Sequence, residues 1–162
     1  MDINIGGKNG LELIKDLHVQ QPQIAVLALS AHAETLYAER VLRAGGRGYV
    51  MKSEGSERLI AAVRKVLAGE TAVSAKVSAK VLELFSGSHT DISPIERLTD
   101  RELEIFQLIG DGKDNTCIAG QLHISPKTVE VHRAHIKEKL QITNNAALIS
   151  FAARWIATQG TM

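Results

Sequence analysis

Residues 98–140 carry the signals for three successive helices, and this stretch constrains the fold more than any other part of the chain. Thr99 followed three residues later by Glu102 forms a capping box, in which each side chain satisfies a backbone N–H that the first turn of a helix leaves unpaired. Two glycines end this helix, and a second, shorter helix follows. The third helix begins sharply, because Ser125 is a favourable N-cap residue and Pro126 suits the first helical position.

Two helices joined by a tight turn, the second of them strongly capped and basic, form a helix-turn-helix pattern, which places the second helix in the DNA major groove. One face of this recognition helix, about residues 125–140, is expected to pack on the other helices through Val129, His132, Ile136 and Leu140. The opposite face and its flanks carry small side chains, which suit base edges, and cations, which suit phosphates. The candidate DNA contacts are therefore Lys127, Thr128, Glu130, Val131, Arg133, Ala134 and Lys137.

The runs LTDRELEIFQLIGDG and NTCIAGQLHISPKTVEVHRAHIKEKL resemble the LuxR-type helix-turn-helix domain of bacterial transcription regulators. The resemblance implies that the helix from Lys127 reads DNA and that the following helix, about residues 144–156, supports dimerisation. Cys117 and Gly120 depart from the family pattern, because charged or polar helix formers are usual at both positions. A glycine inside a helix costs up to about 1 kcal/mol, so Gly120 is expected to soften the second helix.

Residues 2–72 alternate short apolar runs with amphipathic helical patterns, which predicts a parallel α/β sheet. The predicted strands at 24–30 and 48–52 are apolar enough to be buried on both faces. Predicted helices begin near residues 11, 33 and 56. Such folds place their chemistry at the carboxyl ends of the strands, where the polar residues are Asp2, Ser30 and Lys52.

The runs DINIGGKNGLELIK, VLALSAHAE and GYVMKSE are similar to the later part of a response-regulator receiver domain, and a receiver followed by a LuxR-type domain is the layout of the NarL/FixJ class. The resemblance implies that Asp2 accepts a phosphoryl group from a cognate sensor histidine kinase. It also implies that Ser30 closes on the phosphoryl group, that Tyr49 rotates inward behind it and that Lys52 pairs with the phosphate.

Receivers hold Mg²⁺ with two acidic residues after their first strand, together with the phosphate-accepting aspartate. Only Met1 precedes Asp2, so Asp2 is expected to be a partial Mg²⁺ ligand, and Mg²⁺ is expected only if the acidic site is completed. The receiver is therefore expected to be truncated at its N-terminus. Its open strand edge is of the kind that pairs with another chain.

The expected fold class is α/β plus all-α, with a partial doubly wound receiver over residues 1–72 and a four-helix LuxR-type domain over residues 95–162. Residues 73–94 are expected to link the two domains. An amphipathic helix forms the first part of this link, and a flexible tether at 87–94 forms the second.

Charge is segregated along the chain, although the net charge is only +1. Residues 124–162 carry a net charge of +3, whereas residues 96–123 carry −3. A local basic helix on a nearly neutral chain predicts DNA binding that depends on salt and on dimerisation. The single cysteine fits a reducing cytoplasm, and no apolar run approaches the roughly 18 residues of a membrane helix.

Together these patterns predict a sequence-specific DNA-binding transcription regulator, not an enzyme, that binds as a homodimer to half-sites about 10 base pairs apart. Two alternatives remain open: an interaction module that pairs with or sequesters intact receivers through its incomplete sheet, and phosphoryl transfer at Asp2. His132 and His135 have a spacing that metal ligands on a helix use, but no further residue completes a metal site.

Overall fold

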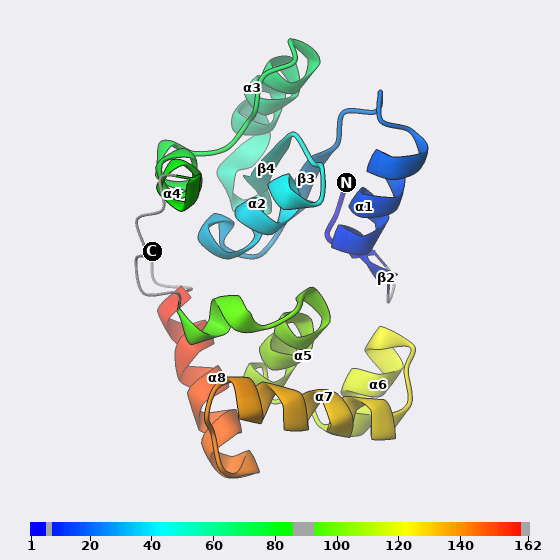
Figure 1. Cartoon of the computed structure of the whole chain (residues 1–162), viewed down its shortest axis with the longest axis vertical. Coiled ribbons are helices and arrows are strands. Elements are labelled where there is room, and N and C mark those ends of the chain that lie inside the picture. The colour runs from blue at the N-terminus through cyan, green and yellow to red at the C-terminus, as the bar shows by residue number, and fades with distance from the viewer. Residues whose placement is uncertain (6–7, 86–92, 160–162) are drawn as a thin grey trace. The chain divides into compact units, whose positions relative to one another are not determined.

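The computed structural model describes residues 1–5, 8–85 and 93–159 (Figure 1). The chain divides into two compact units, Met1–Thr90 and Asp91–Met162. Across the described part of the chain, no helix combines the length and the apolar character that a membrane span needs.

The first unit is built around a pair of parallel strands. Its elements are β1 (Asn4–Ile5), β2 (Lys8–Asn9), α1 (Gly10–Gln20), β3 (Leu27–Ser30), α2 (Glu34–Arg43), β4 (Gly48–Met51), the 3-10 turn η1 (Lys52–Glu54), α3 (Gly55–Leu67) and α4 (Ala75–Phe85). Strands β3 and β4 are parallel, with Leu27 opposite Gly48 and Ser30 opposite Met51. Asp2 adds a single parallel bridge to Leu29, so the chain around Asp2 lies along the other edge of β3.

Helices α2 and α3 both pack on β4, and they cover the two faces of the β3–β4 pair; α3 lies above β4 in Figure 1. Ala28 and Ser30 point to one face and are fully buried, whereas Leu27 and Leu29 point to the other face and are only partly buried. On that second face α3 packs over a small core formed by Val50, Ala62, Val66 and Ala72. The predicted parallel α/β arrangement is confirmed.

The strands are shorter than predicted, and one hairpin was not predicted. Strand β3 begins at Leu27 and not at residue 24, and Ile24 is 48% exposed. Strands β1 and β2 form a short antiparallel hairpin directly before α1. This hairpin positions Asn9 as the N-cap of α1, because its side-chain oxygen accepts a hydrogen bond from the Leu11 N–H at 2.9 Å.

Helix α4 is the helix predicted between the two domains, and it packs on α2. The backbone N–H of Ser74 donates to the Glu34 carboxylate at 2.7 Å, and Lys80 Nζ lies 3.7 Å from Glu39 Oε2. These contacts join α4 to the first unit. Most of the predicted tether at 87–94 lies outside the described residues.

The second unit has the predicted four helices: after the 3-10 turn η2 (Pro94–Arg97) come α5 (Asp100–Gly110), α6 (Asn115–Leu122), α7 (Pro126–Lys139) and α8 (Asn145–Gln159). Their shared core includes Leu103, Phe106, Ile109, Ile118, Val129, Ile136, Leu148 and Ala152. The ring centroid of Phe106 lies 5.6 Å from that of Trp155 and 5.9 Å from that of Phe151. These ring contacts hold α8 against α5.

Helices α5 and α8 approach closely at Gly110. A Cβ atom at this position would lie only 2.8 Å from the backbone oxygen of Ala152 and would also clash with the Ile156 side chain. Gly120 in α6 differs, because no atom lies within 4 Å of the position that its Cβ would occupy. The two glycines thus have opposite roles, since one permits packing and the other only loosens a helix.

We expect Gly110→Ala to destabilise the second unit by about 1–3 kcal/mol, because α5 and α8 must separate to admit the new methyl group. Gly120→Ala is the matched control, and it is expected to raise the free energy of unfolding by up to about 1 kcal/mol because it removes a flexible residue from α6. Urea unfolding followed by the fluorescence of Trp155, the sole tryptophan, measures both. A Gly110→Ala protein as stable as the wild type would contradict the close approach.

Candidate nucleic-acid interface

The recognition helix α7 begins where the sequence predicts. Ser125 Oγ accepts a hydrogen bond from the Thr128 N–H at 3.0 Å, and Pro126 occupies the first helical turn. The preceding helix ends at Leu122, and His123 adopts the left-handed conformation with φ of 52°. The turn between the two helices is therefore short, and the predicted helix-turn-helix is confirmed.

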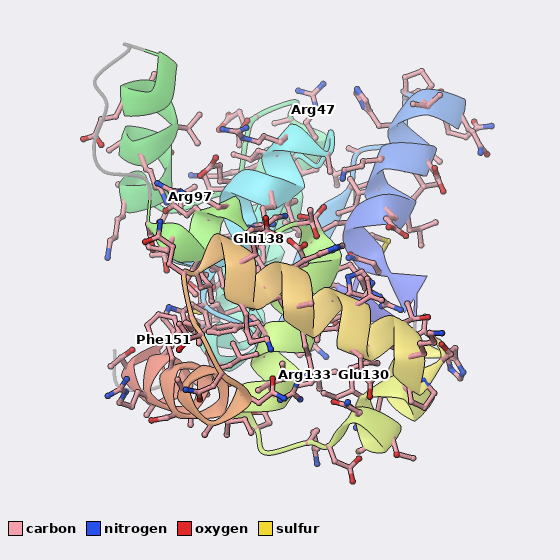
Figure 2. The ribbon with its side chains drawn as sticks, turned by 60° about the horizontal axis from the view of Figure 1, so that its bottom comes forward. Arg47, Arg97, Glu130, Arg133, Glu138 and Phe151 are labelled. Carbon is pink, nitrogen blue, oxygen red and sulfur yellow. The ribbon has the colours of Figure 1, made fainter. Side chains whose placement is uncertain are left out.

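One face of α7 lies on the surface, and it combines the short side chains of Thr128, Val131 and Ala134 with longer charged ones. Its exposed residues are Lys127, Glu130, Val131, Ala134 and Glu138, with Thr128 and Lys137 half-buried beside them. Val131 leaves 48% of its surface exposed, so its apolar side chain is accessible to a partner. Figure 2 labels Glu130 and Glu138 toward opposite ends of α7. These positions are accessible, as the helical wheel predicts, and their contacts with DNA remain a prediction.

Arg133 does not lie on that face, and its predicted placement on an exposed flank is wrong. Only 9% of the residue is exposed, and its Nη1 donates a hydrogen bond to Asn115 Oδ1 at 3.0 Å (Figure 2). Burial lowers the pKa of Arg133. The guanidinium nevertheless remains charged at neutral pH, because the ordinary pKa of an arginine lies far above 7. The helical wheel misplaced Arg133 because a wheel shows only the direction of each Cβ atom. The long Arg133 side chain turns toward Asn115, the first residue of α6.

Glu102 joins the start of α5 to the end of α7. Its side chain accepts hydrogen bonds from the Thr99 N–H at 2.7 Å and from Lys139 Nζ at 2.6 Å, and the residue is only 3% exposed. Burial alone would raise the pKa of Glu102, but the hydrogen bonds from Lys139 and Thr99 outweigh it and hold the pKa below its ordinary value. Glu102 therefore stays ionised at neutral pH, paired with a residue that sequence reasoning did not single out.

Arg101 makes a third polar contact between helices. Its Nη1 donates to Glu104 Oε2 at 2.8 Å, and its Nη2 donates to the carbonyl of Leu122 at 2.8 Å, at the end of α6. Arg101 thus joins α5 to α6, Glu102 joins α5 to α7, and Arg133 joins α7 to α6. We call these three contacts the polar clamps. They fix the direction of α7 relative to the other helices of the unit.

His132 lies against the scaffold, as predicted, and its Nδ1 is buried with no hydrogen-bond partner in the described residues. Burial and the positive charge of Arg101 lower the pKa of His132 below its ordinary value of 6.5. The imidazole is therefore neutral at pH 7. Among the described residues, no group of three or more histidine, cysteine or acidic side chains is arranged to hold a metal ion.

The candidate receiver residues form two groups in the first unit. Asp2 and Lys52 pair with each other, and Ser30 and Tyr49 both bond to the backbone of His32. Lys52 Nζ donates to Asp2 Oδ2 at 2.5 Å, which brings the predicted phosphate acceptor and the predicted cation together. Ser30 Oγ accepts from the His32 N–H at 3.2 Å, and the Tyr49 hydroxyl donates to the His32 carbonyl at 2.7 Å. Burial raises the pKa of Tyr49 well above its ordinary value, so this hydroxyl stays protonated.

A Mg²⁺ ion does not fit the described residues of the first unit. Mg²⁺ takes about six oxygen ligands, usually with at least one or two carboxylates among them. Asp2 already pairs with Lys52, and the described residues hold no acidic cluster that would complete a site.

The geometry of the two units defines a class of protein, a DNA-binding response regulator. Residues 96–152 match the family of bacterial regulatory proteins of the LuxR type, and residues 1–64 match the response regulator receiver domain. The chain belongs to the NarL/FixJ-class response regulators, which carry these two domains and act as DNA-binding transcription regulators of two-component systems. This family consists of transcription regulators and not of enzymes.

Similar proteins cover most of the chain. The oxygen regulatory protein NreC of Staphylococcus haemolyticus is 35% identical over 160 residues, which cover 95% of this chain and 74% of NreC. The response regulator GacA of Pseudomonas aeruginosa is 34% identical over 155 residues, which cover 95% of this chain and 72% of GacA. A solved structure of RcsB from Salmonella typhimurium has the same fold, with a TM-score of 0.62 at 23% identity, and the match covers 94% of this chain and 71% of RcsB.

We expect the free energy of unfolding of the second unit to fall as the pH decreases below 6.5. His132 has a lowered pKa in the folded state, so the unfolded state binds its proton first, and the stability present above 6.5 is lost as the pH falls toward the folded-state pKa. His132→Gln should flatten this dependence below pH 6.5. The exposed His123, which belongs to the same unit, supplies the control as His123→Gln, and an equal flattening in both variants would rule out His132 as the source.

Proposed function

We propose that the second unit binds double-stranded DNA by placing α7 in the major groove. The observation that carries this proposal is the exposed face of α7, where the short side chains of Val131 and Ala134 lie between charged ones and the polar clamps hold the helix in a fixed direction. Small side chains allow the helix axis to come close to the base edges, and the flanking lysines neutralise phosphates. The proposed base contacts are Thr128, Glu130, Val131 and Ala134, and the proposed phosphate contacts are Lys127 and Lys137.

Arg133 has a different role in this proposal, that of a positioning residue. Its guanidinium holds Asn115 at the start of α6, and α6 is the helix that supports α7 in the helix-turn-helix. Removing the guanidinium changes the direction of α7 and leaves Asn115 without its charged partner. Arg133 thus acts on DNA binding through α6.

Two copies of the chain are proposed to bind to each other through α8. The proposed location of this dimer is the cytoplasm, where the target DNA lies. Leu148 and Ala152 face the core of the unit, whereas Ile149 is 45% exposed. The exposed neighbours of Ile149 are small, namely Ala146, Ser150 and Ala153. Small side chains allow a second α8 to approach closely, and the two recognition helices then meet half-sites about 10 base pairs apart.

The first unit keeps the Asp2–Lys52 pair, and Asp2 is the residue that a sensor histidine kinase is proposed to address in a completed receiver. A completed acidic site requires ligands beyond the single carboxylate found in the described residues.

We expect the wild-type chain to select related half-sites from a pool of random duplexes, and Val131→Glu to lose this selection. A carboxylate at this position repels the phosphates and cannot replace the apolar contact with a base edge. Gln20→Glu is the control, because it adds the same negative charge at an exposed position of α1. Sequencing of the bound pool measures the result, and equal selection by wild type and Val131→Glu would remove α7 as the reading element.

We expect Lys127→Met to reduce the slope of log affinity against log salt concentration by about one, because one phosphate contact is lost. Arg133→Met is expected to weaken binding without changing this slope, since its guanidinium contacts Asn115 and not a phosphate. Asn115→Ala should behave like Arg133→Met. Fluorescence anisotropy over a salt series separates these cases, and a slope change for Arg133→Met equal to that for Lys127→Met would make Arg133 a phosphate contact instead.

A further inference from the structure

A cavity of about 610 Å³ lies in the first unit where α4 packs beside α2 (Figure 1). Helices α1, α2 and α4 line it with His18, Leu42, Arg43, Ser78, Val81 and Leu82. The segment before β4 and the segment after α3 complete the wall. Small-molecule sites in proteins typically have volumes of about 300–1,000 Å³, so this space is large enough for a ligand. We call it the α2–α4 cavity.

The α2–α4 cavity lies on the β4 side of the sheet, away from the strand edge at Asp2. Asp2 bridges to one edge of β3, and β4 pairs with the other edge. Ala72 in turn bridges to Gly48 on the outer edge of β4. Thr71 and Val73, which flank Ala72, both line the cavity. The cavity is therefore formed by elements at the opposite edge of the sheet from Asp2.

Positive charge gathers at the cavity. Two arginines line it, and none of the described residues in its wall is acidic. Arg43 already pairs with Glu39, at 2.8 Å. The backbone of Arg47 is fixed, because its N–H donates to the Val26 carbonyl at 2.7 Å and its carbonyl accepts from the Ala72 N–H at 2.9 Å. Its side chain is exposed (Figure 2), and within the described part of the chain no hydrogen bond or ion pair holds its guanidinium.

Aliphatic side chains supply the other part of the wall, namely Leu42, Val73, Val81 and Leu82. Leu82 is 68% exposed, although it belongs to a helix that packs on α2. A ligand that covers these side chains removes apolar surface from water, which is favourable in proportion to the area covered. A guanidinium forms strong, charge-assisted hydrogen bonds with a carboxylate. The cavity thus offers both kinds of contact that an anion with an aliphatic body needs.

We propose that the α2–α4 cavity binds a small organic anion with an aliphatic body, of the medium-chain carboxylate type. The carboxylate pairs with Arg47, and the aliphatic chain lies along Val81 and Leu82. Because the cavity joins α2 to α4, the bound anion adds to the contacts that Ser74 and Lys80 already make with α2, and it stabilises α4 in its docked position. This site goes beyond the proposed function, since it uses neither α7 nor α8.

Isothermal titration calorimetry of the full chain with octanoate tests the charge contact. One octanoate per chain is expected to bind, and 1-octanol, which has the same chain length but no charge, should bind at least about tenfold more weakly. Arg47→Met should weaken octanoate binding at least about tenfold as well. Arg64→Met is the matched control, because it removes an exposed arginine of α3 that does not line the cavity, and it should leave binding unchanged.

The apolar contact is tested by Leu82→Asp, which should abolish octanoate binding because it removes an aliphatic side chain and repels the carboxylate. Val19→Asp is the control, since it places the same charge at an apolar residue of α1 that is 79% exposed and lies outside the cavity wall. All the substituted positions are exposed, and circular dichroism checks that each variant is folded.

Hydrogen exchange of the backbone amides tests the effect on α4. Octanoate is expected to slow exchange in α4 of the wild type and not in α4 of Arg47→Met. Binding of 1-octanol as tight as that of octanoate, or octanoate binding by Arg47→Met as tight as that by the wild type, would overturn the proposal. It would also be overturned by unchanged exchange in α4, or by the absence of saturable binding, including a chain whose own segment fills the cavity.

Discussion

A buried carboxylate is the constraint on which the DNA-binding unit depends. Glu102 is almost fully buried, and an ionised group removed from water is tolerated only when charged and polar partners surround it. Lys139 and the Thr99 N–H supply these partners, from the end of α7 and the start of α5. Since losing either one leaves a buried charge uncompensated, the separation and the direction of the two helices are set together. The apolar core packs the helices, and the polar clamps select one orientation of α7.

Local signals predicted the second unit well, while the side-chain contacts between helices were not predictable. Thr99 with Glu102 and Ser125 with Pro126 act within a single turn, so a sequence shows them directly. The bond from Arg133 to Asn115 and the bond from Lys139 to Glu102 join residues from different helices. Their pairing depends on how the helices cross, and no local pattern reports that. Arg133 was misplaced for this reason, and the role of Lys139 was missed.

In the first unit too, some features were predictable from local patterns in the sequence and others were not. Periodicity predicted the β3–β4 pair, and the polar residues at strand ends predicted that Asp2 and Lys52 meet. Periodicity did not predict the β1–β2 hairpin, because two-residue strands are too short to show an alternating pattern. The exposure of Ile60, Val63 and Leu67 on α3 was not predictable either. A sequence marks those residues as apolar, and only the packing of α3 on the strands shows which of them remain uncovered.

The outward face of α7 takes little part in holding the unit together. Residues such as Val131 and Ala134 are exposed, while the core and the polar clamps use the other sides of the helix. Substitutions at exposed positions away from such features usually change stability by no more than about 0.5 kcal/mol. The side chains that are proposed to contact DNA are therefore free to vary while the scaffold stays intact. A gene duplicate with this architecture is able to acquire a new set of target promoters by a few substitutions on one helix face, without passing through an unstable intermediate.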